Sequence, residues 1–187
     1  MIPKLIRPRR FGDARGWFSE TYNSRSYADL GITDHFVQDN QSLSVARGTV
    51  RGLHCQLPPH AQAKLVRCVS GSIFDVAVDL RSGSPTFGRW VGATLTAEGG
   101  EQLYVPVGFA HGFVTLAENT QVHYKCTDFY APESEAGVVW NDAEIGIDWP
   151  LTDTAPVLSD KDLILPALRD FTGAFPYDGT SLGALEN

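Results

Sequence analysis

Two histidines and a lysine are the residues whose types and spacing most directly suggest chemistry. His54 lies in the run GTVRGLHCQ, Lys64 follows it, and His111 ends the run GEQLYVPVGFAH. A neutral imidazole can move a proton near neutral pH, and an ammonium group can stabilise an oxyanion that develops during a reaction. If the fold brings them into one pocket, these three side chains predict proton-transfer chemistry.

The two runs also have the spacing of the two cupin motifs, and the chain resembles the cupins, small double-sheet jelly rolls with a site in the barrel mouth. The four positions that bind metal in a metal-dependent cupin correspond here to His54, Gln56, Lys64 and His111. A protonated lysine cannot bind a metal and glutamine is a poor ligand, so we expect no metal in this pocket.

Eight short segments rich in Val, Phe, Tyr, Leu and Thr are expected to be the strands that position these residues. They are residues 17–22, 36–45, 64–69, 72–80, 89–96, 102–107, 112–117 and 121–130. Turn signals such as Ser82-Gly83 separate them, and short helices are expected at 24–30 and 159–169. With the cupin resemblance, the expected fold is all-β: a cupin-type double-sheet jelly-roll barrel with a few short peripheral helices.

Length and composition predict a single folded domain. The chain has 187 residues, of which 43% are hydrophobic and 20% charged, close to an average globular protein. We expect one jelly-roll domain over residues 1–171. The Gly-rich, weakly patterned residues 172–187 are expected to form a flexible tail.

Charge and cysteine content exclude several classes of function. The net charge of −7 argues against binding to nucleic acid or to an anionic membrane, although a few basic groups could still bind a small anion. No stretch approaches the roughly 20 apolar residues of a membrane span. The three cysteines lack CxxC spacing and are expected to be reduced, so we expect a cytoplasmic protein.

Longer motifs narrow the resemblance. The segments FGDARGWFSETYN, FVQDNQSLS, AQAKLVRCVSGSIFDVAVDLR, VPVGFAHGFVTL and WNDAEIGIDWP together resemble the dTDP-4-dehydrorhamnose 3,5-epimerase family, from about residue 3 to about residue 170. The resemblance implies a cofactor-independent homodimeric isomerase of dTDP-L-rhamnose biosynthesis. Such an enzyme inverts C3 and C5 of dTDP-4-dehydro-6-deoxy-D-glucose through enolates at the C4 ketone. Cys55 is a departure, because relatives commonly carry an aromatic or aliphatic residue there.

The resemblance also implies the catalytic roles. His54 is the family's base, Asp162 the carboxylate that holds it, Lys64 the cation at the enolate oxygen, and Tyr124 the proton donor on the opposite face. Each has a plainer alternative. Ser159-x-x-Asp162 has the spacing of a helix capping box, Lys64 could be an exposed strand lysine, and Tyr124 could be a packing residue.

A second set of residues is implied to bind the substrate. Cations are needed for the diphosphate and amide or carboxylate groups for thymidine, and Tyr130 matches the tyrosine that stacks on the thymine ring. For Arg15 and Lys161 an exposed surface role remains open. The full set is Arg15, Phe18, Glu20, Gln38, Asn40, Arg51, His111, Tyr130, Glu135 and Lys161.

Two other functions compete with the double epimerase. A single-centre epimerase of another dTDP-deoxysugar pathway would use the same residues, and sequence motifs separate the two poorly. A non-catalytic cupin that binds a sugar nucleotide would need no base matched to an acid. The set His54, Lys64, Tyr124 and Asp162 therefore argues against the binding module.

Overall fold

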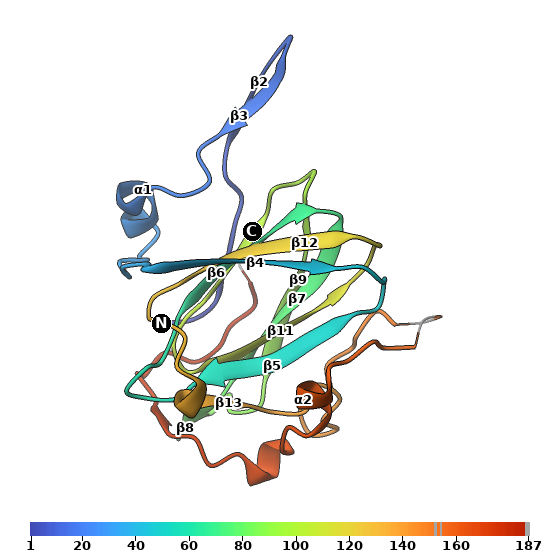
Figure 1. Ribbon diagram of the computed structural model, residues 1–187. Helices are drawn as coiled ribbons and strands as arrows, with labels where there is room; N and C mark the ends of the chain where they lie inside the picture. The colour runs from blue at the N-terminus through green and yellow to red at the C-terminus, as the bar shows by residue number, and fades with distance from the viewer. Residues whose placement is uncertain (152, 154, 186–187) are drawn as a thin grey trace.

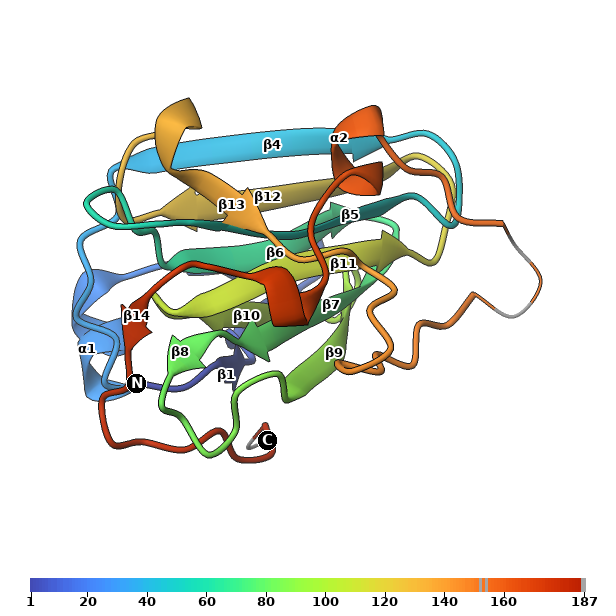
Figure 2. The same cartoon turned by 90° about the horizontal axis from the view of Figure 1, so that it is seen from below.

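Two five-stranded antiparallel sheets form the body of the protein (Figures 1 and 2). The computed structural model describes residues 1–151, 153 and 155–185. In spatial order the first sheet contains β1 (Lys4–Ile6), β10 (Gln102–Val105), β6 (Lys64–Ser70), β12 (Thr120–Cys126) and β4 (Gln38–Ser44). The second contains β13 (Glu135–Gly137), β5 (Val50–Gln56), β11 (Phe109–Thr115), β7 (Ser72–Asp79) and β9 (Trp90–Thr96). The predicted all-β jelly roll is confirmed.

The remaining elements are short. Strands β2 (Arg10–Asp13) and β3 (Gly16–Ser19) form a hairpin, and β8 (Arg81–Ser82) pairs in parallel with β14 (Phe175–Pro176). The helices are α1 (Ser24–Asp29) and α2 (Asp160–Leu163), with 3-10 turns at Pro132–Ser134 and Leu168–Asp170. No helix in the described part of the chain is long and apolar enough to cross a membrane.

Side-chain alternation explains how the second sheet is buried on both faces. On β7, Ile73 and Ala77 pack between the two sheets, whereas Val76 and Val78 pack against the layer formed by the later chain. Because successive side chains on a strand point to opposite faces, Asp75 faces the space between the sheets together with Ile73 and Ala77. The space between the sheets therefore holds a buried carboxylate among apolar side chains.

The hairpin of β2 and β3 projects away from the barrel (Figure 1). Three of its aromatic side chains, Phe11, Trp17 and Phe18, are exposed. A two-stranded hairpin is marginally stable by itself, and the aromatic rings of this one stay largely exposed although Arg9 stacks on Phe11 and Arg10 on Trp17.

The expected helix over 159–169 is mostly absent. Only Asp160–Leu163 is helical, and a separate 3-10 turn follows at Leu168–Asp170. Pro166 disfavours helical geometry at the residue before it and cannot donate a backbone hydrogen bond. The helix therefore ends after one turn, ahead of this proline.

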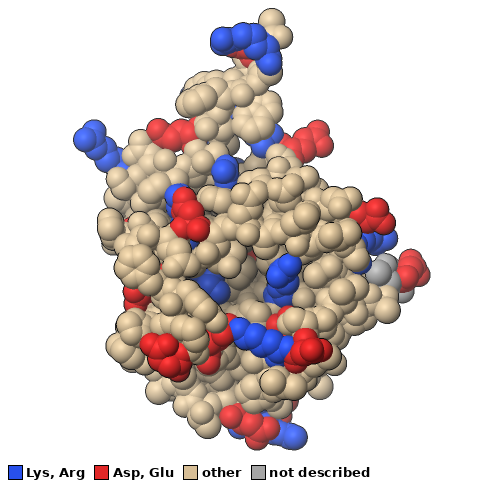
Figure 3. All heavy atoms as spheres, in the orientation of Figure 1, with Lys and Arg blue, Asp and Glu red and all other residues tan. Residues whose placement is uncertain are grey.

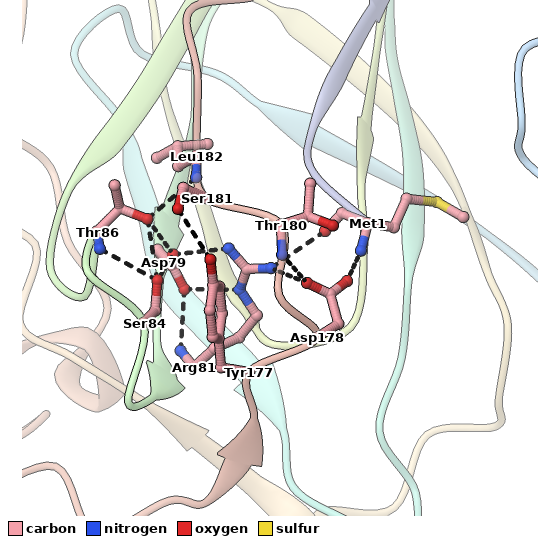
Figure 4. A network of polar contacts seen from close by, with 10 residues as sticks. All are labelled: Met1, Asp79, Arg81, Ser84, Thr86, Tyr177, Asp178, Thr180, Ser181 and Leu182. Carbon is pink, nitrogen blue, oxygen red and sulfur yellow. Dashed lines mark hydrogen bonds and ion pairs between the residues drawn. The ribbon is translucent and has the colours of Figure 1, made fainter.

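The described part of the C-terminal segment is packed against the barrel, unlike the flexible tail expected from residue 172. Phe175 is buried in the core, and Leu182 and Leu185 pack against the cluster between the sheets. Arg81 is buried and binds both Asp79 and Asp178 (Figure 4). A few apolar side chains and one ion-pair network hold this Gly-rich segment, and neither is visible as a sequence pattern.

Candidate active site

A bulge in β5 brings two functional residues to the same cavity. His54 pairs with His111 and Arg51 with Phe113, so three residue steps on β5 oppose two on β11. Gly52 lies between them with φ of 131°, and a Cβ atom there would lie 2.5 Å from the Cα of Gly112. Without a bulge, residues three apart would point to opposite faces. Here both Arg51 and His54 line one cavity.

Two adjoining cavities are lined by residues from strands of both sheets. The first, about 420 Å³, is lined by residues that include Arg51, His111, Lys161 and Asp162. The second, about 350 Å³, is lined by residues that include Gln38, Asn40, Tyr130 and Glu135. They share His54, Lys64 and Tyr124. On the face seen in Figure 3, Lys and Arg side chains surround a hollow.

His54 and Asp162 form a close pair. His54 Nε2 lies 2.6 Å from Asp162 Oδ1, and Ser159 Oγ donates to Asp162 Oδ2 at 2.8 Å. Ser159 also caps α2, because its Oγ accepts the Asp162 backbone N–H at 3.3 Å. Burial acts to raise the pKa of Asp162, but the hydrogen bonds from His54 and Ser159 outweigh it and lower that pKa. Ser159 therefore caps α2 while Asp162 contacts His54, so the two roles do not exclude each other.

A second histidine–carboxylate pair lies deeper between the sheets. His111 Nε2 is 2.7 Å from Asp75 Oδ1, and both side chains are buried. Burial raises the pKa of Asp75 despite the opposing effect of His111 and Lys64. The contact fixes the ring of His111 at the wall of the cavity.

Lys64 presents a poorly solvated ammonium to the cavity. Burial lowers its pKa, while the nearby Cys126, Cys55, Asp75 and Glu135 act in the opposite direction. Within the described residues, no side chain or carbonyl accepts a hydrogen bond from its Nζ. A cation held this way is available to an oxygen that becomes negative during a reaction.

Tyr124 faces His54 from the other sheet. His54 comes from β5 and Tyr124 from β12, and both line the same two cavities. Burial raises the pKa of the Tyr124 phenol, so the group is neutral at physiological pH and can donate a proton. A base and an acid on opposite walls are what inversion of a carbon centre requires.

The second cavity carries polar groups connected by hydrogen bonds. Gln38 Nε2 donates to Asn40 Oδ1 at 3.1 Å, and the Tyr130 hydroxyl donates to Glu135 Oε2 at 3.0 Å. Lys161 forms an ion pair with Glu135. Burial acts to raise the pKa of Glu135, but its bonds to Lys161 and Tyr130 outweigh it and lower that pKa.

Three of the expected substrate-binding residues lie away from these cavities. Arg15, Phe18 and Glu20 belong to the projecting hairpin or follow it, and none lines either cavity. The Arg15 side chain is 89% exposed and pairs with Asp13. The structure therefore assembles the other expected residues but does not bring these three to the site of the same chain.

The sequence indicated a capping role for Ser159 and no role for Ser42. Ser159 holds Asp162, as described above, and Ser42 lines the first cavity with a buried Oγ that has no partner among the described residues. The sequence could have indicated Ser42, because in QDNQSLS its side chain falls on the same face of the strand as those of Gln38 and Asn40. Among the described residues, no group of three His, Cys, Asp or Glu side chains is placed to hold a metal ion.

Comparison with known proteins identifies the family of this chain. The family model described as dTDP-4-dehydrorhamnose 3,5-epimerase matches residues 3–170. A curated dTDP-4-dehydrorhamnose 3,5-epimerase from Pseudomonas aeruginosa is 58% identical over 159 residues, 84% of this chain and 86% of that protein.

Two solved structures of 3,5-epimerases are also similar to this chain. The crystal structure of dTDP-4-dehydrorhamnose 3,5-epimerase from Bacillus anthracis with TDP and PPi bound is 53% identical, with a TM-score of 0.85, over 88% of this chain and 93% of that one. The dTDP-6-deoxy-D-glucose-3,5-epimerase of Legionella pneumophila, in complex with dTDP-4-keto-L-rhamnose, is 48% identical. It has the same TM-score, over 89% of this chain and 88% of that one.

Proposed function

The chain belongs to the dTDP-4-dehydrorhamnose 3,5-epimerase family, and we propose that its paired cavities perform the reaction with His54 as base and Tyr124 as acid. The protein is an isomerase that inverts C3 and C5 of dTDP-4-dehydro-6-deoxy-D-glucose, in dTDP-L-rhamnose biosynthesis. Both carbons are adjacent to the C4 ketone, so one set of groups serves both centres.

The reaction begins with removal of a proton beside the ketone. Asp162 accepts a hydrogen bond from the His54 nitrogen that faces it, which leaves the other ring nitrogen unprotonated as the base. The electron pair of the broken C–H bond moves into an enolate at C4. The Lys64 ammonium stabilises the enolate oxygen, an interaction that grows as charge develops.

Inversion requires the proton to return from the other face of the sugar. The Tyr124 phenol donates it from β12, across the cavity from His54 on β5. This opposition of base and acid from facing sheets is the observation that carries the proposal. His54 then releases its proton to solvent and Tyr124 takes one up, which restores both groups for the same steps at the second carbon.

The nucleotide would occupy the second cavity and its entrance. Tyr130 supplies a ring for the thymine to stack on, with Gln38, Asn40 and Glu135 as polar neighbours. Arg51 and Lys161 supply positive charge for the diphosphate, and His111 lies beside the sugar.

Two variants test the assigned roles. His54→Ala should abolish exchange of the carbon-bound protons with solvent, whereas Tyr124→Phe should still exchange them slowly without inversion. Affinity for dTDP should change little in either variant. Exchange at the native rate in His54→Ala, or loss of dTDP binding in both, would overturn the assignment.

We also propose a homodimer in which the hairpin completes the site of the partner. Its exposed aromatic side chains and the distance of Arg15, Phe18 and Glu20 from their own cavity support this arrangement. Mixing inactive Arg15→Ala and His54→Ala chains tests it. Random pairing would restore about one quarter of native activity, because half the dimers are mixed and each has one intact site. No recovery after subunit exchange would exclude the shared site.

We propose further that the enzyme works in the cytoplasm. All three cysteines are free and buried, as is usual for a protein in a reducing compartment. Recovery of the activity in the soluble cytoplasmic fraction after gentle lysis is the expected result, and recovery in an extracellular or membrane fraction would contradict it.

A further inference from the structure

Gln56 connects two loops at the entrance of the second cavity. Its Nε2 donates to the His60 carbonyl at 2.6 Å and to the Phe129 carbonyl at 3.2 Å. Its Oε1 accepts the Ala131 backbone N–H at 3.0 Å. The residue is 4% exposed, and all three bonds reach main-chain atoms outside its own strand. His60 and Gln62 join the two loops through Asp128, and the Gln56 amide ties both loops, residues 57–63 and 127–131, to β5.

The bonds to the second loop flank one residue, Tyr130. Phe129 precedes it and Ala131 follows it, and both are held by the same amide. The Tyr130 ring is not fixed by packing, since the residue is 56% exposed. Its other contacts are polar: its N–H donates to Gln38 Oε1 at 3.1 Å, and its hydroxyl to Glu135 Oε2. The orientation of the Tyr130 ring thus depends on hydrogen bonds, and Gln56 makes those to the residues directly before and after it.

The strand explains why residue 56 can reach this loop. Gln56 is two residues after His54 on β5, so both side chains point between the sheets. In a metal-dependent cupin this position would hold a ligand. Here the side chain has both a donor and an acceptor, and both are used by backbone groups.

We infer that Gln56 is a positioning residue for nucleotide binding, which acts by holding the main chain on both sides of Tyr130. The inference rests on the proposed function, because it takes Tyr130 as the stacking partner of the thymine. Glutamine is required because glutamate cannot donate to the two carbonyls and an apolar side chain makes none of the three bonds.

The test compares Gln56→Glu and Gln56→Met with a matched control, Gln121→Glu, which makes the same change on β12 outside both cavities. The dissociation constant for dTDP is measured by calorimetry, and kcat and KM by epimerisation. Both Gln56 variants should bind dTDP at least about tenfold more weakly, or about 1.4 kcal/mol, with KM raised similarly and kcat within about threefold. The control should match the native protein.

A double-mutant cycle with Tyr130→Ala separates positioning from general damage. If Gln56 acts through Tyr130, Gln56→Met should weaken dTDP binding less than about twofold once the ring is gone. Additive losses, native affinity in both Gln56 variants, or a fall in kcat as large as the rise in KM would overturn the inference. Failure of the native protein to bind dTDP would instead refute the proposed function.

Discussion

Replacing Asp162 with asparagine should abolish most catalysis while leaving the fold and nucleotide binding intact. Ser159 Oγ donates to Asp162 Oδ2, so an asparagine at this position places its carbonyl oxygen toward Ser159. Its amide nitrogen then faces His54 where Oδ1 stands now, 2.6 Å from Nε2. An amide donor requires an unprotonated ring nitrogen, which moves the imidazole proton to the nitrogen that should act as base.

The size of the expected fall in kcat follows from two effects, the lost hydrogen bond to His54 and the wrong tautomer of its ring. Removing a hydrogen bond to a charged group costs about 1.5–3 kcal/mol, which is about a ten- to hundredfold loss of rate. The wrong tautomer adds to this, and in serine proteases the equivalent change costs about 10⁴ in kcat. We therefore expect kcat to fall by about 10² to 10⁴. The helix cap should persist, because the capping bond joins Ser159 Oγ to the backbone N–H of residue 162, and the substitution does not change that N–H.

The assay is single-turnover exchange of substrate protons with solvent, with dTDP affinity and the melting temperature as controls. Adding Ser159→Ala to Asp162→Asn should recover part of the loss, because the amide is then free to turn its oxygen toward His54. A kcat within about fivefold of native in Asp162→Asn would refute the dyad. A double variant worse than the single one would refute the tautomer argument.

Substitutions at Lys64 and at Arg81 test two further claims, one about catalysis and one about stability. Lys64→Met should lower kcat by about 10²–10³, as for loss of one oxyanion contact, with little change in dTDP affinity. Because burial lowers the pKa of Lys64, the native kcat should fall with rising pH, and the midpoint of this fall should lie below the ordinary lysine pKa of 10.5. Any activity that Lys64→Arg retains should not show this fall. Arg81→Met should destabilise the fold by about 3–5 kcal/mol in denaturant unfolding, because Asp79 stays buried without its cation. Burial acts to raise the pKa of Asp79, but its hydrogen bonds, those from Arg81 included, hold it below the ordinary value. That carboxylate stabilises the fold above its unfolded pKa of about 3.9, and the stabilisation is lost as pH falls through the lower folded pKa. The difference in unfolding free energy between the native protein and Arg81→Met should therefore be largest at neutral pH and should shrink in acid, as Asp79 becomes protonated.

Strands with regular alternation were predictable, and the strand that carries His54 was not. Residues 64–69, 72–80 and 89–96 were expected and correspond to β6, β7 and β9. In contrast, β5 was not predicted, because Gly52 and the bulge interrupt its alternation and its inward side chains are polar. The motif found His54, while periodicity alone would have missed its strand.

The members of the candidate site and the contact of His54 with Asp162 were predictable, whereas the second role of Ser159 was not. His54, Lys64, Tyr124 and Asp162 were expected together from sequence motifs, and they line one cavity. That Ser159 both caps α2 and holds Asp162 depends on how residues far along the chain meet β5.

The buried charges on β7 show the same limit. Asp75 and Asp79 are two carboxylates within the otherwise apolar strand SIFDVAVD. Asp75 meets His111 on the neighbouring strand, and Asp79 meets Arg81, Ser84 and Thr86. Such pairings are set by strand register and loop closure, which a single sequence does not reveal.

The most direct test of the central claim is NMR of the substrate in deuterated water with the purified protein. A single ketone flanked by two exchangeable carbons, with His54 and Tyr124 on facing walls, predicts that deuterium enters at both C3 and C5, with inversion of both. Deuterium at one carbon alone would contradict the double epimerisation and indicate a single-centre enzyme. The absence of deuterium at either carbon would contradict the catalytic account altogether.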